Sequence, residues 1–318
     1  MKQFISAHDV ASIPDLITKG LAYKANPLRD LVLGQHKTIG LLFLNPSLRT
    51  RISTQVAARN LGMEVIVFNA DKEGWQMEFQ DGVVMNGSTS EHIREAAAVL
   101  GQYVSILGVR SFPGLTERDK DYSEQIINSF IRFSGVPVVS LESATLHPLQ
   151  SLADVITIRE TFREQRKPKV VLTWAPHVRA LPQAVPNSFA QWINAWGACD
   201  FTIAHPAGYS LAPEFTAGAT ITSDQDKAFE GADYVYVKNW SSYEDYGKIL
   251  NSDPSWMVSE AKISRTNNAR VMHCLPVRRN VVIEDKVLDG PNAIVVQEAG
   301  NRVWAAQAVL SEILKHRI

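Results

Sequence analysis

The sequence predicts an α/β protein built from two doubly wound parallel-sheet domains. Short apolar segments alternate with helical patterns along the whole chain, which is typical of parallel sheets covered by helices. The 318 residues are about twice the length of an ordinary single domain. With 45% hydrophobic and 20% charged residues, the composition is that of a globular protein.

The first half of the chain begins its alternation with a buried strand at residues 38–44, where almost every side chain is apolar. A helix is expected from Leu48 to Asn60, with Gly62 where a C-cap glycine would lie. Further strands are expected at residues 65–68, 104–109 and 137–141, and helices at residues 91–101 and 123–134.

The second half repeats the pattern after a domain boundary near residues 146–150. Its expected strands are residues 169–174, 201–204, 234–237 and 270–274, and its expected helices are residues 149–162 and 186–196. The last segment, residues 303–314, has apolar side chains at helical spacing, so we expect it to dock on a core. These side chains are Val303, Ala306, Leu310 and Leu314.

Charge and cysteine content argue against several function classes. Lys and Arg number 32 against 33 Asp and Glu, so no nucleic acid or membrane partner is expected. The two cysteines suit a reducing cytosol, and the amino terminus has no apolar signal-peptide core. We therefore expect a cytoplasmic protein. No metal-ligand spacing, P-loop or dinucleotide fingerprint is present, so no metal or cofactor is predicted.

The first motif that could carry chemistry, Ser47-Leu48-Arg49-Thr50-Arg51, joins a buried strand to a helix. Backbone N–H groups at a helix start carry partial positive charge, and hydroxyl and guanidinium donors beside them suit a phosphate. The alternative is an ordinary Ser N-cap followed by two solvated arginines.

The second motif, His147-Pro148-Leu149-Gln150, opens a helix after a strand. Its His and Gln can both face one ligand at the carboxyl end of a sheet, the His donating to a carbonyl oxygen and the Gln binding an NH2 group. A hydrogen-bonded structural histidine is the alternative.

The third motif, His273-Cys274-Leu275-Pro276, also follows an apolar segment, and Arg278 comes soon after it. Cys274 is either a nucleophile or a small apolar filler, and no orienting carboxylate is evident nearby. Arg110 and Arg302 follow other predicted elements and are either surface charges or phosphate ligands.

In order and spacing, these three motifs resemble the aspartate/ornithine carbamoyltransferase family across nearly the whole chain. The resemblance implies an interdomain active site and a homotrimer whose sites are shared between subunits. It implies a carbamoyl-phosphate-binding domain at residues 1–146, completed by a C-terminal helix at residues 300–318. Residues 147–299 would form the domain that binds the amine substrate.

The resemblance also implies roles for single residues. Thr50, Arg110 and His147 would hold the carbamoyl oxygen, and Gln150 the carbamoyl nitrogen. The implied carbamoyl-phosphate-binding residues are Ser47, Leu48, Arg49, Thr50, Arg51, Trp75, Arg110, His147, Gln150, Cys274, Leu275 and Arg302. Of these, Trp75 would reach the site of a neighbouring subunit.

The acceptor is expected to be an N-acylated ornithine, because the chain lacks the Asp-x-x-Ser-Met-Gly loop that binds free ornithine in relatives. Where relatives that use N-acetylornithine carry a Glu and a modified, negatively charged Lys, this chain has Ser90 and Val282. A neutral pocket near positive side chains favours an acyl group with its own carboxylate, so N-succinyl-L-ornithine is expected. The expected acceptor-binding residues are Ser90, Glu142, His177, Arg179, Lys238, Cys274 and Arg278.

The expected reaction is transfer of the carbamoyl group from carbamoyl phosphate to the δ-amine of N-succinyl-L-ornithine in arginine biosynthesis. Two other functions remain open. One is the same transfer to N-acetyl-L-ornithine. The other is a non-catalytic paralogue that binds carbamoyl phosphate.

Overall fold

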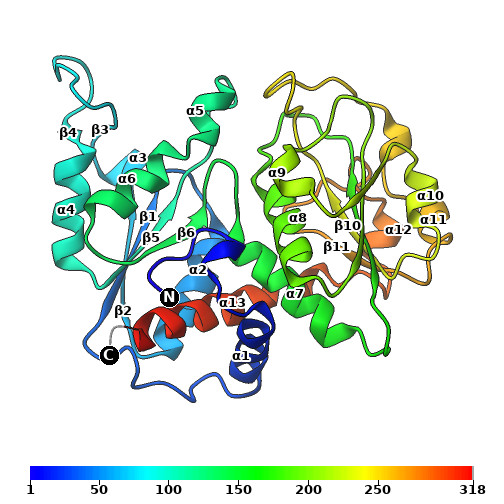
Figure 1. The fold of residues 1–318 in the computed structure, drawn as a ribbon, viewed down its shortest axis with the longest axis horizontal. Helices are drawn as coiled ribbons and strands as arrows, with labels where there is room; N and C mark the ends of the chain where they lie inside the picture. The colour runs from blue at the N-terminus through cyan, green and yellow to red at the C-terminus, as the bar shows by residue number, and fades with distance from the viewer. Residues whose placement is uncertain (317–318) are drawn as a thin grey trace. The chain divides into compact units, whose positions relative to one another are not determined.

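The computed structural model describes residues 1–316, which form two compact units. Unit 1 contains residues 1–114 and 119–149 and the chain from Arg302 onward, and unit 2 contains residues 115–118 and 150–301. Among the described residues, three helices contribute to both units: α5 (Arg118–Tyr122), α7 (Pro148–Thr161) and α13 (Val295–Lys315) (Figure 1). None of the described helices has the length and apolar character that crossing a membrane requires.

Unit 1 is built on a parallel sheet in the order β2-β1-β5-β6 (Figure 1). The strands are β1 (Thr38–Phe43), β2 (Glu64–Asn69), β5 (Ile106–Arg110) and β6 (Val138–Glu142). In the centre, Ile39 of β1 pairs with Val65 on one side and Ile106 on the other. A central strand covered on both faces must be apolar throughout, which explains the composition of β1.

The helices of unit 1 pack around this sheet. On one face α4 (Ile93–Tyr103) and α6 (Gln125–Phe133) contribute Ile93 and Phe130 to a core with Leu107 of β5. Elsewhere α2 (Leu48–Asn60) is joined to α13 by Asn60 Nδ2, which donates to Gln307 Oε1 at 3.0 Å. The remaining elements are a 3-10 turn (Ala7–Asp9), α1 (Ile13–Ala25), α3 (Ala70–Glu73), β3 (Met77–Glu78), β4 (Glu91–His92) and α5 (Arg118–Tyr122).

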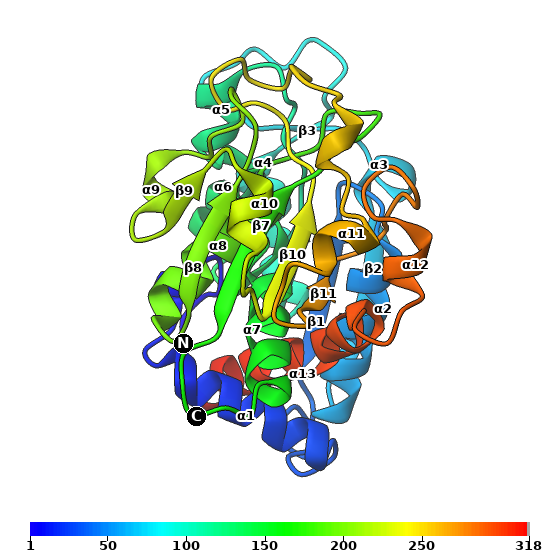
Figure 2. The same cartoon turned by 90° about the vertical axis from the view of Figure 1, so that its right-hand side faces the viewer.

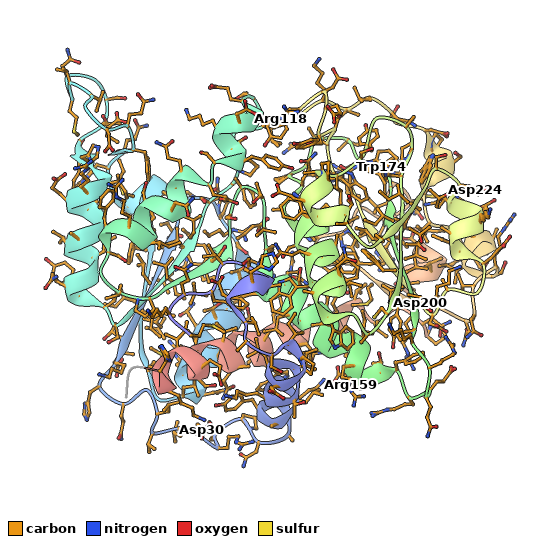
Figure 3. All side chains as sticks on the ribbon, viewed as in Figure 1. Asp30, Arg118, Arg159, Trp174, Asp200 and Asp224 are labelled. Carbon is orange, nitrogen blue, oxygen red and sulfur yellow. The ribbon has the colours of Figure 1, made fainter. Side chains whose placement is uncertain are left out.

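Unit 2 has a five-stranded parallel sheet in the order β11-β10-β7-β8-β9, seen in Figure 2. The strands are β7 (Lys169–Trp174), β8 (Asp200–Ala204), β9 (Thr220–Thr222), β10 (Tyr234–Lys238) and β11 (Arg270–Met272). Trp174, labelled in Figure 3, is almost fully buried, and its indole nitrogen donates to Trp240 O at 3.0 Å.

Strand β10 shows how the sheet of unit 2 is covered on both faces. Val235 and Val237 belong to a core that includes Phe229. The alternate residues Tyr234 and Tyr236 face the opposite side, because successive side chains of a strand point in opposite directions. The helices are α8 (Ala184–Trp196), α9 (Pro213–Thr216), α10 (Gln225–Phe229), α11 (Glu260–Ile263) and α12 (Asp285–Leu288), with a 3-10 turn at Pro254–Trp256.

The predicted α/β class with parallel sheets is confirmed, and α2 and β7 have the predicted bounds. The last helix was predicted too short, because α13 begins at Val295 rather than at residue 303. Gly300 and Asn301 suggest a loop in the sequence, but the Asn301 side chain is buried and donates to Thr157 Oγ1 at 2.8 Å. The predicted position 318 lies outside the described residues.

Strand β11 was predicted too long, since it ends at Met272 and not at residue 274. His273 donates its backbone N–H to the Glu298 carboxylate. At His273 this side-chain hydrogen bond takes the place of a backbone hydrogen bond to a neighbouring strand. The sequence also gave no prediction for α1 or for the short strand β9.

Candidate functional site

The loop between β1 and α2 carries the first motif. Ser47 is the N-cap of α2, and its hydroxyl accepts from Thr50 N at 3.3 Å. Leu48 is exposed, whereas Arg49 is half-buried and its Nε atom is buried without a hydrogen-bond partner among the described residues. Arg51 donates to Asn69 Oδ1 at 3.4 Å. The structure thus contains the Ser47 N-cap of the structural alternative, but the arginine beside it is half-buried and not fully solvated.

Two charged residues lie side by side where β5 and β6 end. A register shift after Val109 pairs Arg110 with Glu142, and the Arg110 guanidinium donates to the Glu142 carboxylate. Both side chains are only 8% exposed, so this ion pair is shielded from solvent. Arg110 also stacks over the ring of Phe112 at 4.6 Å from the centroid. Arg110 is therefore a buried group and not the surface charge that one sequence alternative allowed.

Arg302 brings the first residues of the second motif together with the first motif. Its guanidinium donates to Thr50 Oγ1 at 2.8 Å and lies 3.3 Å from His147 Nε2. His147 Nε2 is also 3.5 Å from the Glu142 carboxylate. Burial, followed by the charges of Arg302 and Arg110, lowers the pKa of His147 well below 6.5. His147 is thus a neutral imidazole at neutral pH.

These side chains form the unit 1 cluster, defined here as Arg49, Thr50, Arg110, Glu142, His147 and Arg302. The cluster contains three guanidinium groups and one carboxylate, so it has an excess of positive charge. His147 Nδ1 and the Nε atoms of Arg49 and Arg110 are buried without hydrogen-bond partners among the described residues. Buried donors are normally satisfied, so this arrangement suits an anionic ligand with several acceptor oxygens.

Two other predicted residues of unit 1 lie in the exposed loop around β3 and β4. Trp75 is 60% exposed, and its indole nitrogen donates to Glu91 Oε2 at 2.7 Å. Ser90 is exposed and its backbone N–H donates to Gln76 O at 2.9 Å. Their described hydrogen bonds are made within this loop, so the structure does not join them to the unit 1 cluster.

In unit 2 the third motif forms a tight, strained turn after β11. The backbone N–H of Leu275 donates to His273 Nδ1 at 2.8 Å, and Leu275 has φ 55°. A leucine in the left-handed region costs about 1–3 kcal/mol, and such residues cluster at functional sites. Cys274 is half-buried, and neither cysteine of the chain forms a disulfide.

Gln150, the last residue of the second motif, is fully buried in unit 2. Its side-chain nitrogen donates to Asp154 Oδ1 at 2.8 Å and to Glu298 Oε1 at 3.3 Å. Neither Asp154 nor Glu298 was predicted as a site residue. An aspartate one helical turn after Gln150 was the available signal, since side chains four residues apart meet on a helix.

Four of the residues predicted to bind the acceptor form a positive group in unit 2, namely His177, Arg179, Lys238 and Arg278, whereas Ser90 and Glu142 belong to unit 1. Lys238 ends β10 and is buried, while Arg179 and Arg278 are exposed. Arg278 Nε donates to His177 Nε2 at 3.1 Å. Burial lowers the pKa of His177, and the neighbouring Lys238 charge acts in the same direction. A neutral His177 can therefore accept from Arg278 while its other nitrogen faces Arg179 O at 3.0 Å.

Two residues near this group have structural roles. Arg279 forms ion pairs with Asp285 at 2.9 Å and Asp289 at 2.7 Å. Val282, predicted to mark the acyl pocket, is 2% exposed and belongs to the core of unit 2. As a valine, position 282 adds apolar packing to the core and no charge.

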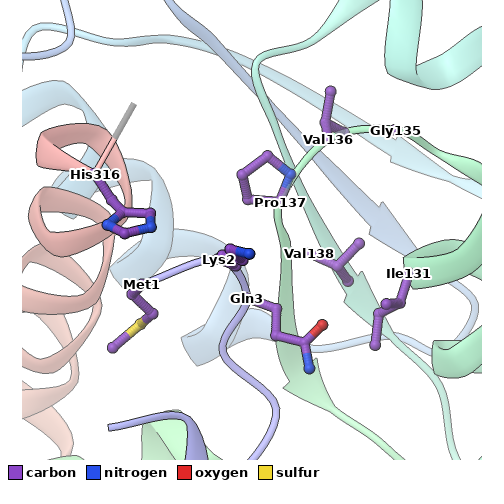
Figure 4. Close-up of a pocket in the computed structure, with 9 residues that line it drawn as sticks. All are labelled: Met1, Lys2, Gln3, Ile131, Gly135, Val136, Pro137, Val138 and His316. Atoms are coloured by element: carbon purple, nitrogen blue, oxygen red, sulfur yellow. The ribbon is translucent and has the colours of Figure 1, made fainter. Parts of the chain in front are cut away.

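Among the described residues, no group of three or more His, Cys, Asp or Glu side chains is arranged to hold a metal ion. A pocket of about 240 Å³ in unit 1 is lined by the chain's first residues, by residues from α6 to the start of β6, and by His316 (Figure 4). It contains none of the predicted site residues, so we assign no chemistry to it.

Comparison with known proteins identifies the family. Residues 2–160 match the carbamoyl-P binding domain of aspartate/ornithine carbamoyltransferases, and residues 183–313 match their Asp/Orn binding domain. N-succinylornithine carbamoyltransferase of Bacteroides thetaiotaomicron is 49% identical, with 99% of each chain covered. N-acetylornithine carbamoyltransferase of Xylella fastidiosa is 37% identical, with 98% of each covered.

Solved structures of relatives agree with this. Acetylornithine transcarbamylase complexed with acetylcitrulline has a TM-score of 0.92 and 36% identity, covering 98% of this chain and 99% of that one. A variant of N-acetyl-L-ornithine transcarbamylase with a glutamate replaced by serine, complexed with carbamyl phosphate and N-succinyl-L-norvaline, also scores 0.92 at 36% identity, covering 98% of this chain and 100% of that one. This chain belongs to the aspartate/ornithine carbamoyltransferase family.

Proposed function

We propose that this protein transfers the carbamoyl group of carbamoyl phosphate to the δ-amine of N-succinyl-L-ornithine, giving N-succinyl-L-citrulline and phosphate. The observation that carries the proposal is the unit 1 cluster, in which the Nε atoms of Arg49 and Arg110 are buried without acceptors among the described residues. Relatives at 49% identity that share almost the full length are N-succinylornithine carbamoyltransferases.

Carbamoyl phosphate binds to the unit 1 cluster in this proposal. Arg49, Arg51 and Arg302, with Ser47 and the start of α2, hold the phosphate by charge-assisted hydrogen bonds. Leu48 and Leu275 contribute backbone groups, and Trp75 reaches the phosphate from another subunit.

Arg110 must change partner when carbamoyl phosphate binds, because Glu142 now occupies its guanidinium. In the proposal it exchanges this carboxylate for the carbamoyl oxygen, which leaves Glu142 able to accept an N–H of the second substrate. The exchange keeps both buried charged groups hydrogen-bonded, which matters because a buried charge without any polar partner is costly.

The chemistry is an addition followed by an elimination. The neutral δ-amine forms a bond to the carbamoyl carbon, and the resulting oxyanion is held by Thr50, Arg110 and His147. The carbon–oxygen bond to phosphate then breaks, and phosphate departs with the proton that the amine loses. Positioning and electrostatic stabilisation supply the catalysis, and no covalent intermediate with the thiol of Cys274 is needed.

The acceptor preference rests on charge. An N-succinyl group carries a carboxylate that an N-acetyl group lacks, and His177, Arg179, Lys238 and Arg278 form a positive group in unit 2. The exposed Ser90 adds no negative charge. The structures of N-acetyl-L-ornithine transcarbamylase variants in which one glutamate is replaced hold N-succinyl-L-norvaline, so neutral substitution is compatible with succinyl binding in that relative.

We place the protein in the cytoplasm, in arginine biosynthesis, as a homotrimer that shares its sites between subunits. The exposed Trp75 is the residue that we assign to the neighbouring site. Light scattering will give the assembly. Mixing inactive Trp75→Ala and Arg110→Met proteins after subunit exchange should restore part of the activity if the sites are shared, and should restore none if each subunit works alone.

The decisive assay is product formation from carbamoyl phosphate with N-succinyl-, N-acetyl- and free L-ornithine in parallel. Strong preference for the succinyl substrate is expected. Preference for the acetyl substrate would keep the chemistry and refute the charge argument. An absence of turnover with all three would indicate a non-catalytic carbamoyl-phosphate-binding protein.

A further inference from the structure

A buried carboxylate in α13 links two of the sequence motifs. Glu298 is completely buried. Its Oε2 atom accepts the backbone N–H of His273 at 2.8 Å, and its Oε1 atom accepts from Gln150 Nε2 at 3.3 Å. One carboxylate therefore holds the start of the turn at Cys274 and the side chain of Gln150. The proposed function gives neither Glu298 nor its neighbour Asp154 a role.

The two carboxylates fix which way the Gln150 amide points. An ionised carboxylate can only accept hydrogen bonds, and an amide offers its two donors on the nitrogen alone. Because both Asp154 and Glu298 contact Nε2, the nitrogen must face them and the oxygen Oε1 must face away from them. The flip of a glutamine side chain is otherwise ambiguous, and here the chemistry of its partners settles it.

We propose that Glu298 and Asp154 are positioning residues that make Gln150 present an acceptor to the carbamoyl NH2 group. This inference rests on the proposed function, in which Gln150 binds the carbamoyl nitrogen. An amide pointing the other way would set its own N–H groups against those of the substrate. Glu298 and Asp154 therefore select a ligand with an NH2 group over one of the same shape that lacks it.

Glu298→Gln tests this directly, since a glutamine has one acceptor oxygen where Glu298 uses two. Its NH2 group would then oppose an N–H of either Gln150 or His273. Asp154→Leu removes the other acceptor without adding a donor. The matched control is Glu160→Gln, because Glu160 also accepts amide donors of α13, from Gln297 at 2.7 Å and Asn301 at 2.6 Å, but lies ten residues beyond Gln150 in α7.

The measurement is titration calorimetry of the full-length protein with two stable analogues of carbamoyl phosphate. Phosphonoacetamide keeps the NH2 group, and acetonylphosphonate has a methyl group in its place. We expect the wild-type protein to prefer the amide. Glu298→Gln and Asp154→Leu should each reduce that preference about 3-fold to 10-fold, as expected for one hydrogen bond. Binding of acetonylphosphonate should be unchanged, and Glu160→Gln should retain the full preference.

Three results would overturn the inference: a wild-type protein without preference, a variant that keeps the wild-type preference, or a parallel loss of affinity for both analogues. The ketone serves as an internal check of folding, and two positions are tested in case one variant does not fold. No acceptor substrate is involved, so the outcome is separate from the acceptor assay above. Failure of turnover with N-succinyl-L-ornithine would leave these ratios measurable.

Discussion

The two units place charge in opposite ways. In unit 1 four side chains of the cluster are buried and contact one another in pairs, Arg110 with Glu142 and Arg302 with Thr50. In unit 2 two of the positive groups, Arg179 and Arg278, are exposed. Buried charged groups interact strongly with their neighbours and are costly to replace. Exposed charged groups interact weakly, so mutation can change them at little cost to stability. The difference suggests that unit 1 fixes the chemistry and that the exposed charges of unit 2 adjust the choice of acceptor.

The largest effect on activity should come from removing the buried Arg110–Glu142 ion pair of unit 1. Arg110→Met removes the cation that pairs with Glu142 and that we assign to the oxyanion, so kcat/KM should fall about 10²-fold to 10³-fold. Steady-state turnover will measure it. Arg279→Met is the control, because Arg279 forms only exposed ion pairs with Asp285 and Asp289 and should leave kcat/KM near the wild-type value. Equal losses in both variants would argue against a special role for Arg110.

Burial in unit 1 also predicts a pH dependence of stability. The pKa of folded His147 lies well below the 6.5 of an unfolded histidine, so on acidification the unfolded chain binds a proton that the folded chain does not. The contribution of neutral His147 to the free energy of unfolding is therefore present above pH 6.5 and is lost as the pH falls below 6.5. Its slope approaches about 1.4 kcal/mol per pH unit.

Chemical denaturation of the wild type and of His147→Gln between pH 7 and pH 5 will test this. The range brackets 6.5, the ordinary pKa of histidine in the unfolded chain. The wild-type free energy of unfolding should fall more steeply than that of the variant. Parallel curves would mean that His147 takes up its proton as easily in the folded protein as in the unfolded one.

Replacing an exposed arginine of unit 2 should have a smaller effect, and it should change the KM for only one substrate. Arg278→Gln removes a charge near the proposed succinyl carboxylate, and the KM for N-succinyl-L-ornithine should rise about 3-fold to 10-fold. The KM for carbamoyl phosphate should stay the same. The neighbouring Arg279→Gln serves as the control, and an unchanged KM in Arg278→Gln would exclude Arg278 from acyl recognition.

The smallest effect is expected at Cys274. We assign its backbone, not its sulfur, to the site, so Cys274→Ser should keep kcat within about 3-fold of the wild type. A loss near 10³-fold in turnover would instead assign the thiol a chemical role.

The sequence predicted local motifs better than it predicted contacts between residues that lie far apart in the chain. The loop at Ser47 was predictable because its signals, an apolar strand and an N-cap, lie next to each other in the chain. The pairing of Arg110 with Glu142 depends on which strands are neighbours and on a register shift, which a single sequence does not show.

The buried polar network was missed for a related reason. Glu298 lies in a stretch where Gly300 and Asn301 suggest a loop, and its partners are 25 and 148 residues away in the chain. Its function as a hydrogen-bond acceptor appears only once β11 and α7 have been placed beside it. The roles of Ser90 and Trp75 stay predictions, since their described hydrogen bonds lie within one loop.

The claim that acceptor choice is set by charge is tested most directly by adding one negative charge. In Ser90→Glu, the ratio of kcat/KM for N-succinyl-L-ornithine to that for N-acetyl-L-ornithine should fall at least about 10-fold, because a like charge then opposes the succinyl carboxylate. The KM for carbamoyl phosphate should not change. An unchanged ratio would contradict the account.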